Sequence, residues 1–471
     1  MNTSSAVSEK GHSGAERPPR LRRSLFAGLC VYGVALLLMH MSVPSGVTRE
    51  SVSIAGPDGK PCVATVWRPN SPKAIMLIGH GVTSNQGVMA TIAKAFAANG
   101  YTAVTLDFWG HGRSRERFDW SSNAAQLKAW FAWAHGLGGL PMAYLGHSMG
   151  GMAGANALAA PDTGVSAFVS LGMLPGNIPA CKTAVAAGRF EELFSEGEAR
   201  AKAGDKADVI ISPFSDHSLE PLDPVLLERI VTWVNGALGL PGPVRFPWGA
   251  WARVLLATVF GCVSAFWLAG LAAGMLPRKA HPVRVQPLHR RWSVNPYRFT
   301  GRLLGRTGMG DAPRSGSFLS ALVKGVLFSA VFALLLSWVL DGHMFTSGLA
   351  HPGRFATWCI FAPFLLPPLL AGAWVLERVD LGGMRMRFFV SALTRCAPLL
   401  LLSAALFVAV PRLAFGCMIL CIWAFIMAML SAVHAVTTHR AADYRAGAVA
   451  SAVLLAWTLA YWLPLSWPWI R

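Results

Sequence analysis

Long apolar segments constrain this chain more than any other feature of its sequence. Each is about 20 residues long and could cross a bilayer as a helix. The chain is 54% hydrophobic and only 14% charged, which soluble domains rarely are. We therefore expect a membrane protein with seven spans, at 25–43, 251–276, 317–340, 355–376, 388–410, 413–436 and 447–466.

The first apolar run, 25–43, follows a basic segment, 1–24, which we expect in the cytoplasm. A cleaved signal peptide is the alternative interpretation of this run. The run is longer than a usual signal core, and no cleavage site of small residues follows it, which favours an uncleaved anchor.

Charge is distributed unevenly along the chain. Residues 47–246 contain 16 basic and 16 acidic side chains, so this stretch is neutral, and the net charge of +18 comes from the rest. The excess lies in short connections beside apolar runs. The loop at 277–316 has nine Lys or Arg residues and one Asp. Basic residues beside apolar runs are typical of loops that stay in the cytoplasm. We therefore expect this charge to set the orientation in the membrane, and we expect no nucleic-acid partner. The segment 47–245 then lies on the other side of the membrane, in the periplasm of a bacterium.

The neutral segment alternates between apolar strands and helical segments, which is typical of a parallel sheet covered by helices. Within it, the sequence Gly-His-Ser-Met-Gly at 146–150 follows an apolar strand and opens a helix rich in small residues. In that setting G-x-S-x-G forms a tight turn that lifts the serine above the sheet. The turn predicts Ser148 as a nucleophile and the backbone N–H of Met149 as a donor to an oxyanion.

Two further motifs precede this turn in the chain: Ile-Gly-His-Gly at 78–81 and Asp-Phe-Trp-Gly-His-Gly-Arg-Ser at 107–114. Together the three motifs resemble the successive landmarks of the α/β-hydrolase superfamily. The resemblance covers 47–245 and implies a doubly wound, mostly parallel sheet and an esterase-like activity. It also implies a second oxyanion donor, the N–H of Val82, and a triad in the chain order Ser, acid, His.

The resemblance assigns the remaining triad positions residue by residue. His217 follows the last strand, at the position of the base, and no other His lies between Ser148 and the second apolar run. The family spacing after a Gly selects Glu191 as the acid, with Glu192 as its rival. Because we expect a helix over 190–203, a plain acid in a first helical turn is the alternative role for Glu191.

The connection between the strand ending at Leu171 and the strand beginning at Thr183 is short. We therefore expect little or no cap domain and an open site. The predicted function is a membrane-anchored serine hydrolase that cleaves an ester or amide-like bond of a small or lipid-like acyl substrate, with no cofactor and no metal. The alternative is a sensor or assembly protein with a ligand-binding, inactive domain. Cys62 and Cys181 lie where a disulfide is chemically possible, and the sequence does not show whether they meet.

Overall fold

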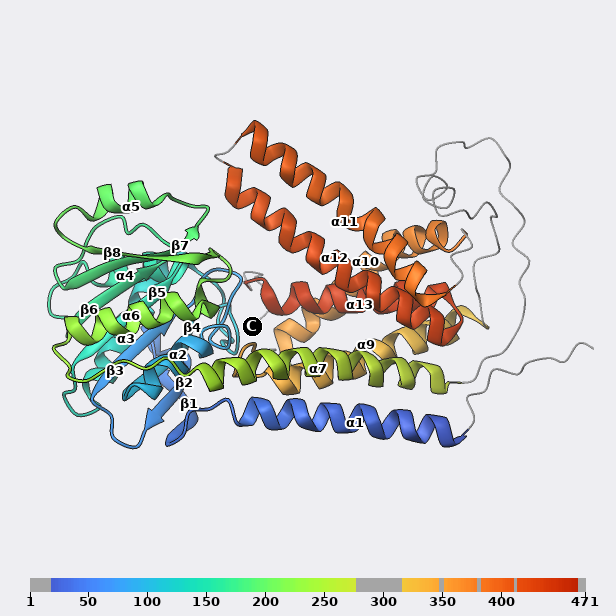
Figure 1. The fold of residues 1–471 in the computed structure, drawn as a ribbon, viewed down its shortest axis with the longest axis horizontal. Helices are drawn as coiled ribbons and strands as arrows, with labels where there is room; N and C mark the ends of the chain where they lie inside the picture. The colour runs from blue at the N-terminus through green and yellow to red at the C-terminus, as the bar shows by residue number, and fades with distance from the viewer. Residues whose placement is uncertain (1–17, 277–315, 347–350, 379–382, 411–412, 465–471) are drawn as a thin grey trace, which may run out of the picture.

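The computed structural model describes residues 18–276, 316–346, 351–378, 383–410 and 413–464. The predicted basic loop at 277–316 lies almost wholly outside these residues, as does most of the segment 1–24. The chain forms a sheet domain (47–246) and a helical region made of the remaining helices. Figure 1 shows the sheet domain at one end of the helices, which extend away from it.

The sheet domain is built on one eight-stranded sheet with the order β1-β2-β4-β3-β5-β6-β7-β8. Strands β3 to β8 run parallel, and the hairpin β1–β2 is joined antiparallel to β4. This mostly parallel sheet confirms the predicted fold class. The strands are β1 (Val47–Ala55), β2 (Pro61–Pro69), β3 (Ala74–Gly79), β4 (Tyr101–Asp107), β5 (Met142–His147), β6 (Val165–Leu171), β7 (Lys182–Phe190) and β8 (Asp208–Asp216).

Helices cover both faces of the sheet, because successive side chains of a strand point to opposite faces. In β3, Met76 and Ile78 pack with helices α2 and α6, whereas Ile75 and Leu77 pack with α3 and α4. All four side chains are buried, so neither face of the central sheet is exposed to solvent. The helices are α2 (Ala90–Ala98), α3 (Asn123–His135), α4 (Met149–Ala157), α5 (Glu196–Ala203) and α6 (Pro224–Ala237).

Within the described residues, the helical region has six helices that are long and apolar enough to cross a membrane. Each of these helices corresponds to one of the predicted apolar runs and begins or ends within a few residues of it. The seventh run forms α13 (Tyr444–Trp462), which is not among these six, so the number of spans stays a prediction. The other helices are α1 (Pro18–His40), α7 (Trp248–Met275), α9 (Phe318–Leu340), α10 (Pro352–Leu376), α11 (Met384–Ala409) and α12 (Ala414–Ala441).

The two parts of the chain meet at the carboxyl ends of the parallel strands. The Arg354 side chain, at the start of α10 and 1% exposed, donates hydrogen bonds to the carbonyl oxygens of Gly110 and Gly112 in the loop after β4. It also donates to the carbonyl oxygen of Ala460 in α13. A buried guanidinium requires hydrogen-bond acceptors. Arg354 finds them in the sheet domain and in the helical region, so it links these two parts of the chain. The loops that follow the parallel strands therefore face the helical region.

Candidate active site

Ser148 lies in a sharp turn between β5 and α4. Its φ of +52° is in the left-handed region, which non-glycine residues rarely adopt. The turn is compact because a Cβ on Gly146 would lie 2.2 Å from the carbonyl oxygen of Gly150, and a Cβ on Gly150 would lie 2.7 Å from that of Gly79. The strained serine and its two glycines have the conformation expected of a nucleophile elbow.

The loop after β3 packs directly against this turn. A Cβ on Gly81 would lie 3.1 Å from the Cβ of Ser148, so Val82 follows immediately beside the serine. Within the described residues, the backbone N–H groups of Val82 and Met149 donate no hydrogen bond. An N–H group that is free of other partners and lies beside a nucleophile can donate to an oxyanion.

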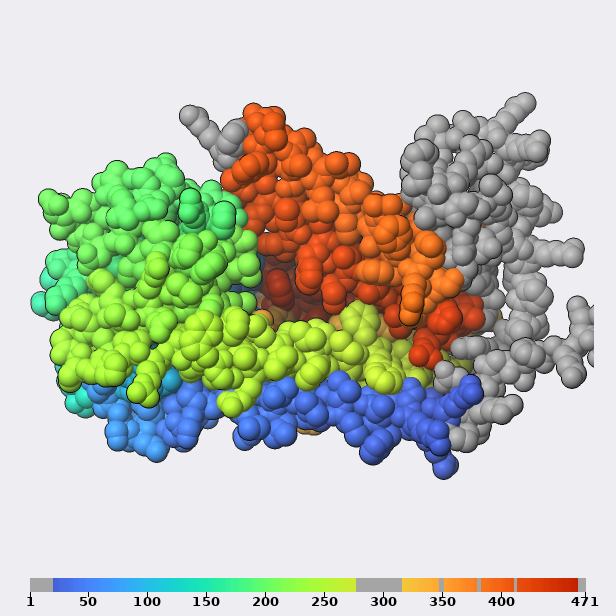
Figure 2. Space-filling view, in the orientation of Figure 1, coloured from blue at the N-terminus to red at the C-terminus, as the bar shows by residue number. Residues whose placement is uncertain are grey.

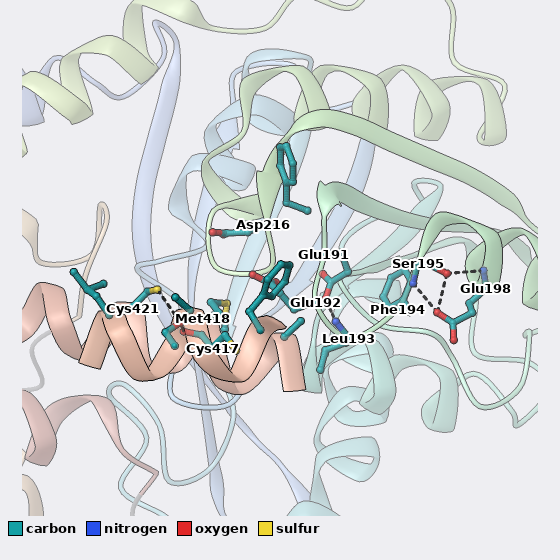
Figure 3. Close-up of a pocket in the computed structure, with 16 residues that line it drawn as sticks. Glu191, Glu192, Leu193, Phe194, Ser195, Glu198, Asp216, Cys417, Met418 and Cys421 are labelled. Atoms are coloured by element: carbon teal, nitrogen blue, oxygen red, sulfur yellow. Dashed lines mark hydrogen bonds between the residues drawn. The ribbon is translucent and has the colours of Figure 1, made fainter. Parts of the chain in front are cut away.

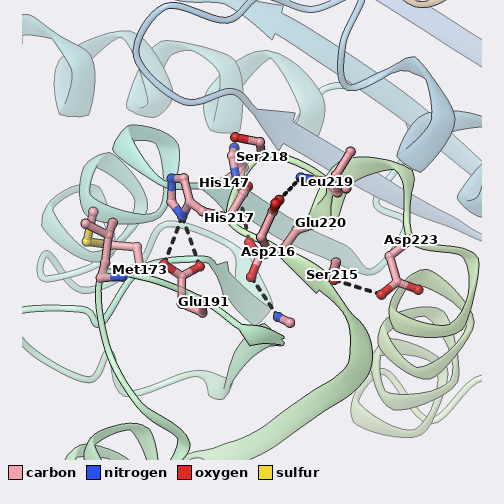
Figure 4. Close-up of polar contacts among 12 residues, drawn as sticks. His147, Met173, Glu191, Ser215, Asp216, His217, Ser218, Leu219, Glu220 and Asp223 are labelled. Carbon is pink, nitrogen blue, oxygen red and sulfur yellow. Dashed lines mark hydrogen bonds and ion pairs between the residues drawn. The ribbon is translucent and has the colours of Figure 1, made fainter. Parts of the chain in front are cut away.

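His217 and Glu191 come together from neighbouring strands. Glu191 follows β7 and His217 follows β8, and the Glu191 carboxylate lies 2.9 Å from Nδ1 of His217 (Figure 4). Both side chains are buried in this contact. A carboxylate at this distance fixes the orientation of the ring and directs Nε2 away from the acid, as a triad requires.

Glu192, the rival acid, contacts the same histidine in another way. Its carboxylate accepts a hydrogen bond from the backbone N–H of His217, at 3.1 Å, and does not reach the ring. Burial raises the pKa of Glu192 to about 7. The geometry thus favours Glu191 as the residue that orients the imidazole.

The predicted helix over 190–203 begins later than expected. Helix α5 starts at Glu196, after a capping box in which Ser195 accepts from the N–H of Glu198 and the Glu198 carboxylate accepts from that of Ser195. Such a box fixes a helix N-terminus. Glu191 therefore lies in a loop, and the alternative role as an acid in the first helical turn is wrong.

Two further histidines near Ser148 hold the loops together. Nδ1 of His80 lies 2.8 Å from the carbonyl oxygen of Gly81, and Nε2 accepts a hydrogen bond from the N–H of Phe108. Nε2 of His147 lies 3.0 Å from the carbonyl oxygen of His217. Burial lowers the pKa of His80 to about 4 and that of His147 to about 3, so both rings are neutral at physiological pH. Neutral rings suit a structural role, in which their hydrogen bonds hold neighbouring loops together, rather than a role in proton transfer.

Ser148 and His217 lie at the same edge of the sheet without a direct hydrogen bond between Oγ and the ring in this structure. The segment after β6 contacts both residues. The carbonyl oxygen of Leu171 accepts from the N–H of Ser148, and a Cβ on Gly172 would lie 3.0 Å from Nδ1 of His217. Hydrogen bonds of a catalytic pair are often long without substrate and shorten when it binds.

Glu220 is a buried carboxyl group beside the site that the sequence did not suggest. One oxygen accepts a hydrogen bond from the N–H of Gly188, and the other lies 3.5 Å from Nε2 of His147. Burial, and next the negative charge of Glu191, raise the pKa of Glu220 well above its usual range. Both effects favour the protonated form of this carboxyl group. The sequence signal for this contact was Gly172, because a residue without a side chain leaves room there for the Glu220 carboxyl group.

Among the described residues, one group could hold a metal ion: His147, His217 and Glu220, with ligand atoms within 4.8 Å of one another. Two of these residues already make other contacts, His147 with the carbonyl oxygen of His217 and His217 with Glu191. The raised pKa of Glu220 also disfavours the ionised form, in which carboxylates bind metals. These three side chains are therefore better suited to hydrogen bonding than to holding a metal ion.

The sheet domain has no cap of its own, but the site is not open as expected. Ser148 is 8% exposed and His217 is 6% exposed. Phe415, in the first turn of α12, stands edge-on to the His217 ring with 5.6 Å between ring centres. The short connection after β6 correctly predicted the missing cap, and an element 200 residues away covers the site in its place.

The two cysteines of the sheet domain do not form a disulfide in this structure. Both thiols are free, and Cys62 is buried while Cys181 is partly exposed. Burial raises the pKa of the Cys62 thiol to about 11, which keeps it protonated and unreactive.

Comparison with known proteins adds an independent observation. Residues 70–194 match the family model described as serine aminopeptidase, S33, a hydrolase family. This segment begins just before β3 and contains both Ser148 and Glu191. The sheet domain is an α/β-hydrolase domain. We refer to 47–246 as the hydrolase domain below.

Curated relatives match part of the chain. A monoacylglycerol lipase of Mycolicibacterium smegmatis is 33% identical over 110 residues, which are 22% of this chain and 39% of that protein. A provisionally named phosphoribosyl transferase of Mycobacterium tuberculosis is 27% identical over 215 residues, 41% of this chain and 48% of that protein. The chain thus spans less than half the length of each of these relatives.

Solved structures also match part of the chain. A cold-adapted esterase from an Arctic intertidal metagenomic library is 21% identical, covering 41% of this chain and 95% of that one, with a TM-score of 0.35. An α/β serine hydrolase without lid from Xanthomonas campestris is 18% identical, covering 42% of this chain and 97% of that one, with a TM-score of 0.35.

Proposed function

We propose that this chain is a membrane-anchored serine hydrolase that cleaves an ester or amide-like bond through an acyl-enzyme intermediate. The observation that carries the proposal is the 2.9 Å contact between Glu191 and Nδ1 of His217, at the sheet edge where Ser148 occupies a strained elbow. The matching hydrolase family and the lipase relative agree with it.

In the proposed reaction, Ser148 Oγ attacks the carbonyl carbon while His217 takes the hydroxyl proton. Glu191 orients the imidazole and stabilises its positive charge. The N–H groups of Val82 and Met149 bind the oxyanion, and His217 gives its proton to the leaving group. Water then repeats the sequence on the acyl-enzyme, releasing the acid and restoring Ser148.

Turnover of short acyl esters by the full-length protein in detergent tests this function. We expect Ser148→Ala and His217→Ala to abolish the acyl-enzyme route, while Ser121→Ala, at an exposed hydroxyl far from the site, leaves turnover unchanged. A fluorophosphonate that labels the wild type but not Ser148→Ala separates an enzyme from an inactive ligand-binding domain. Unchanged turnover in Ser148→Ala would contradict the proposal.

The proposal places the hydrolase domain outside the cytoplasm. Helix α10 begins at the hydrolase domain, through Arg354, and so ends at the far end of the helical region, where α11 begins (Figure 1). Basic side chains gather at that far end: Arg20, Arg22, Arg23, Arg378, Arg385, Arg387, Arg440 and Arg445. Such an arrangement is typical of a cytoplasmic face.

Reporter fusions test this orientation. We expect a fluorescent reporter on the N-terminus to be active in the cytoplasm, and a phosphatase that works only outside the cytoplasm to be active when inserted after Gly242. The reverse pattern would place the hydrolase domain in the cytoplasm and contradict the proposed topology.

A further inference from the structure

Exposed apolar side chains of the hydrolase domain are concentrated beside its candidate triad. Phe190 is 61% exposed and Leu193 is also exposed, and these residues flank Glu191. Phe214, 67% exposed, and Leu219 flank His217 in the same way. Large apolar groups that gather on a surface usually mark a site of contact with an apolar partner.

A cavity lies between this apolar edge and the α11–α12 hairpin. It has a volume of about 950 Å³, which is in the range of sites for small organic ligands. Figure 2 shows the surface hollowed between the hydrolase domain and the helical region. Residues 190–195 line one wall, and the opposite wall is formed by Leu400, Ala404, Phe407, Ala414, Cys417 and Met418. We refer to this cavity as the hairpin groove.

The hairpin groove reaches one of the candidate catalytic residues. Glu191 itself lines it, and in Figure 3 the α12 residues Cys417 and Met418 lie across from the segment that carries Glu191. Next to this wall, Met418 Sδ accepts a hydrogen bond from the hydroxyl of Ser218, and Phe415 contacts the ring of His217. A ligand in the groove therefore has one end beside Glu191, whose carboxylate contacts the ring of His217.

The other wall of the groove includes α11, the least buried of the six long apolar helices in the described part of the chain. Only 6% of the apolar window of α11 is buried within the protein, against 50% in α7. Among the described residues, side chains of α11 such as Leu401 and Val408 are largely uncovered by protein, and Val408 is 81% exposed. In a membrane, lipid tails would cover this surface, so the groove is continuous with an apolar solvent that holds acyl chains.

We propose that the hairpin groove binds the long acyl chain of a lipid ester that enters from the bilayer along the α11–α12 hairpin. This inference rests on the proposed hydrolase function and names its substrate class. The ester carbonyl reaches Ser148, whose Oγ forms a bond to the acyl carbon as the carbon–oxygen bond of the ester breaks. The leaving alcohol takes the serine proton through His217, and water later releases the fatty acid from Ser148.

Two neighbouring alanines on α11 provide a matched pair of variants. Both side chains are exposed, but only Ala404 lines the groove, and Ala405 points elsewhere on the helix. We therefore compare Ala404→Trp with Ala405→Trp in full-length protein reconstituted in phosphatidylcholine nanodiscs. The probes are an acetyl ester and a palmitoyl ester of the same fluorogenic alcohol.

We expect Ala404→Trp to lower palmitoyl ester turnover by at least about tenfold, because each methylene displaced from an apolar site weakens binding severalfold. Acetyl ester turnover should stay within about twofold of the wild type, since an acetyl group does not extend into the groove. Ala405→Trp should resemble the wild type with both esters. Equal losses of both esters in Ala404→Trp, or no difference between the two variants, would overturn the proposal.

A second measurement on the wild type keeps the test independent of how Ala404→Trp folds. A palmitoyl ester with a photoreactive group at the end of its chain is irradiated in the same nanodiscs, and the adducts are located by mass spectrometry. Adducts within 400–421 support the groove, and adducts confined to other segments overturn it. A wild type that hydrolyses neither ester would instead refute the proposed function, while the adducts still decide whether the groove binds the chain.

Discussion

The Glu191 carboxylate lies 2.9 Å from Nδ1 of His217, although the two residues follow different strands of the sheet. The contact separates Glu191 from its neighbour Glu192, which reaches only the backbone of the same histidine. It also determines which ring nitrogen of His217 is left for Ser148. Several consequences of this arrangement can be measured.

Removing the charge of Glu191 should disable the histidine. We expect Glu191→Gln to lower kcat by a factor on the order of 10⁴, as loss of a triad acid does when the ring is left in the wrong tautomer. Glu192→Gln, which keeps an oxygen for the backbone N–H of His217, should change kcat by less than about tenfold. Rates with a short acyl ester distinguish the two, and a larger effect of Glu192→Gln would assign the acid to Glu192.

The raised pKa of Glu220 should make stability depend on pH. In the folded protein its pKa is raised well above the usual 4.5, so above about pH 4.5 the unfolded chain loses a proton that the folded chain keeps. Stability attributable to Glu220 therefore falls as pH rises from about 4.5 to the folded pKa, by up to about 1.4 kcal/mol per pH unit. Glu220→Gln keeps a neutral hydrogen-bonding group and should remove this decline.

Thermal unfolding of full-length wild type and Glu220→Gln in detergent, between pH 5 and pH 8, measures the effect. The melting temperature of the variant should fall less across this range than that of the wild type. Parallel curves for the two proteins would show that Glu220 is ionised in the folded state.

Phe415 should restrict the access of soluble substrates to His217. The ring covers the histidine from α12, so Phe415→Ala removes part of the cover without altering the hydrolase domain. We expect kcat/KM for a water-soluble acetyl ester to rise severalfold, mainly through a lower KM. Trp338→Ala, at a 73% exposed position on α9, serves as the control. A lower rate with the acetyl ester in Phe415→Ala alone would mean that Phe415 supports the histidine rather than shielding it.

Arg354 should hold the hydrolase domain to the helices. Its removal leaves the buried carbonyl oxygens of Gly110, Gly112 and Ala460 without their donor, at about 1–3 kcal/mol for each unsatisfied group. Arg354→Ala should therefore unfold at a clearly lower temperature and be cleaved faster by proteases between the two parts. Arg253→Ala, which loses one exposed hydrogen bond to the carbonyl oxygen of Met41, should change little.

The elements that could be predicted from the sequence have local signals. The turn at Ser148 was predictable because the strand, the two glycines and the helix around it are contiguous in the chain. The position of His217 directly after the last strand was predictable because the strand is itself a local signal. The catalytic roles of both residues stay predictions. The start of α5 was not, since Ser195 and Glu198 form a capping box inside a segment that also suits a longer helix.

Contacts between distant segments left no such signal. Phe415 covers His217 although the two residues are almost 200 positions apart. In the sequence, Phe415 is an apolar residue at the start of a predicted span, which indicates the span but not the contact. Glu377 illustrates the same limit. It follows the apolar run at 355–376 directly, so the run itself contains no acid, yet its carboxylate is buried against Arg387 and His434.

The most direct test of the account is to identify the residue that a fluorophosphonate modifies in the full-length protein. The account predicts a single adduct on Ser148, found by peptide mass spectrometry and absent from Ser148→Ala, with much slower labelling in His217→Ala because the histidine activates the hydroxyl. Labelling at another residue, or no labelling of a folded wild type under conditions that modify other serine hydrolases, would contradict it.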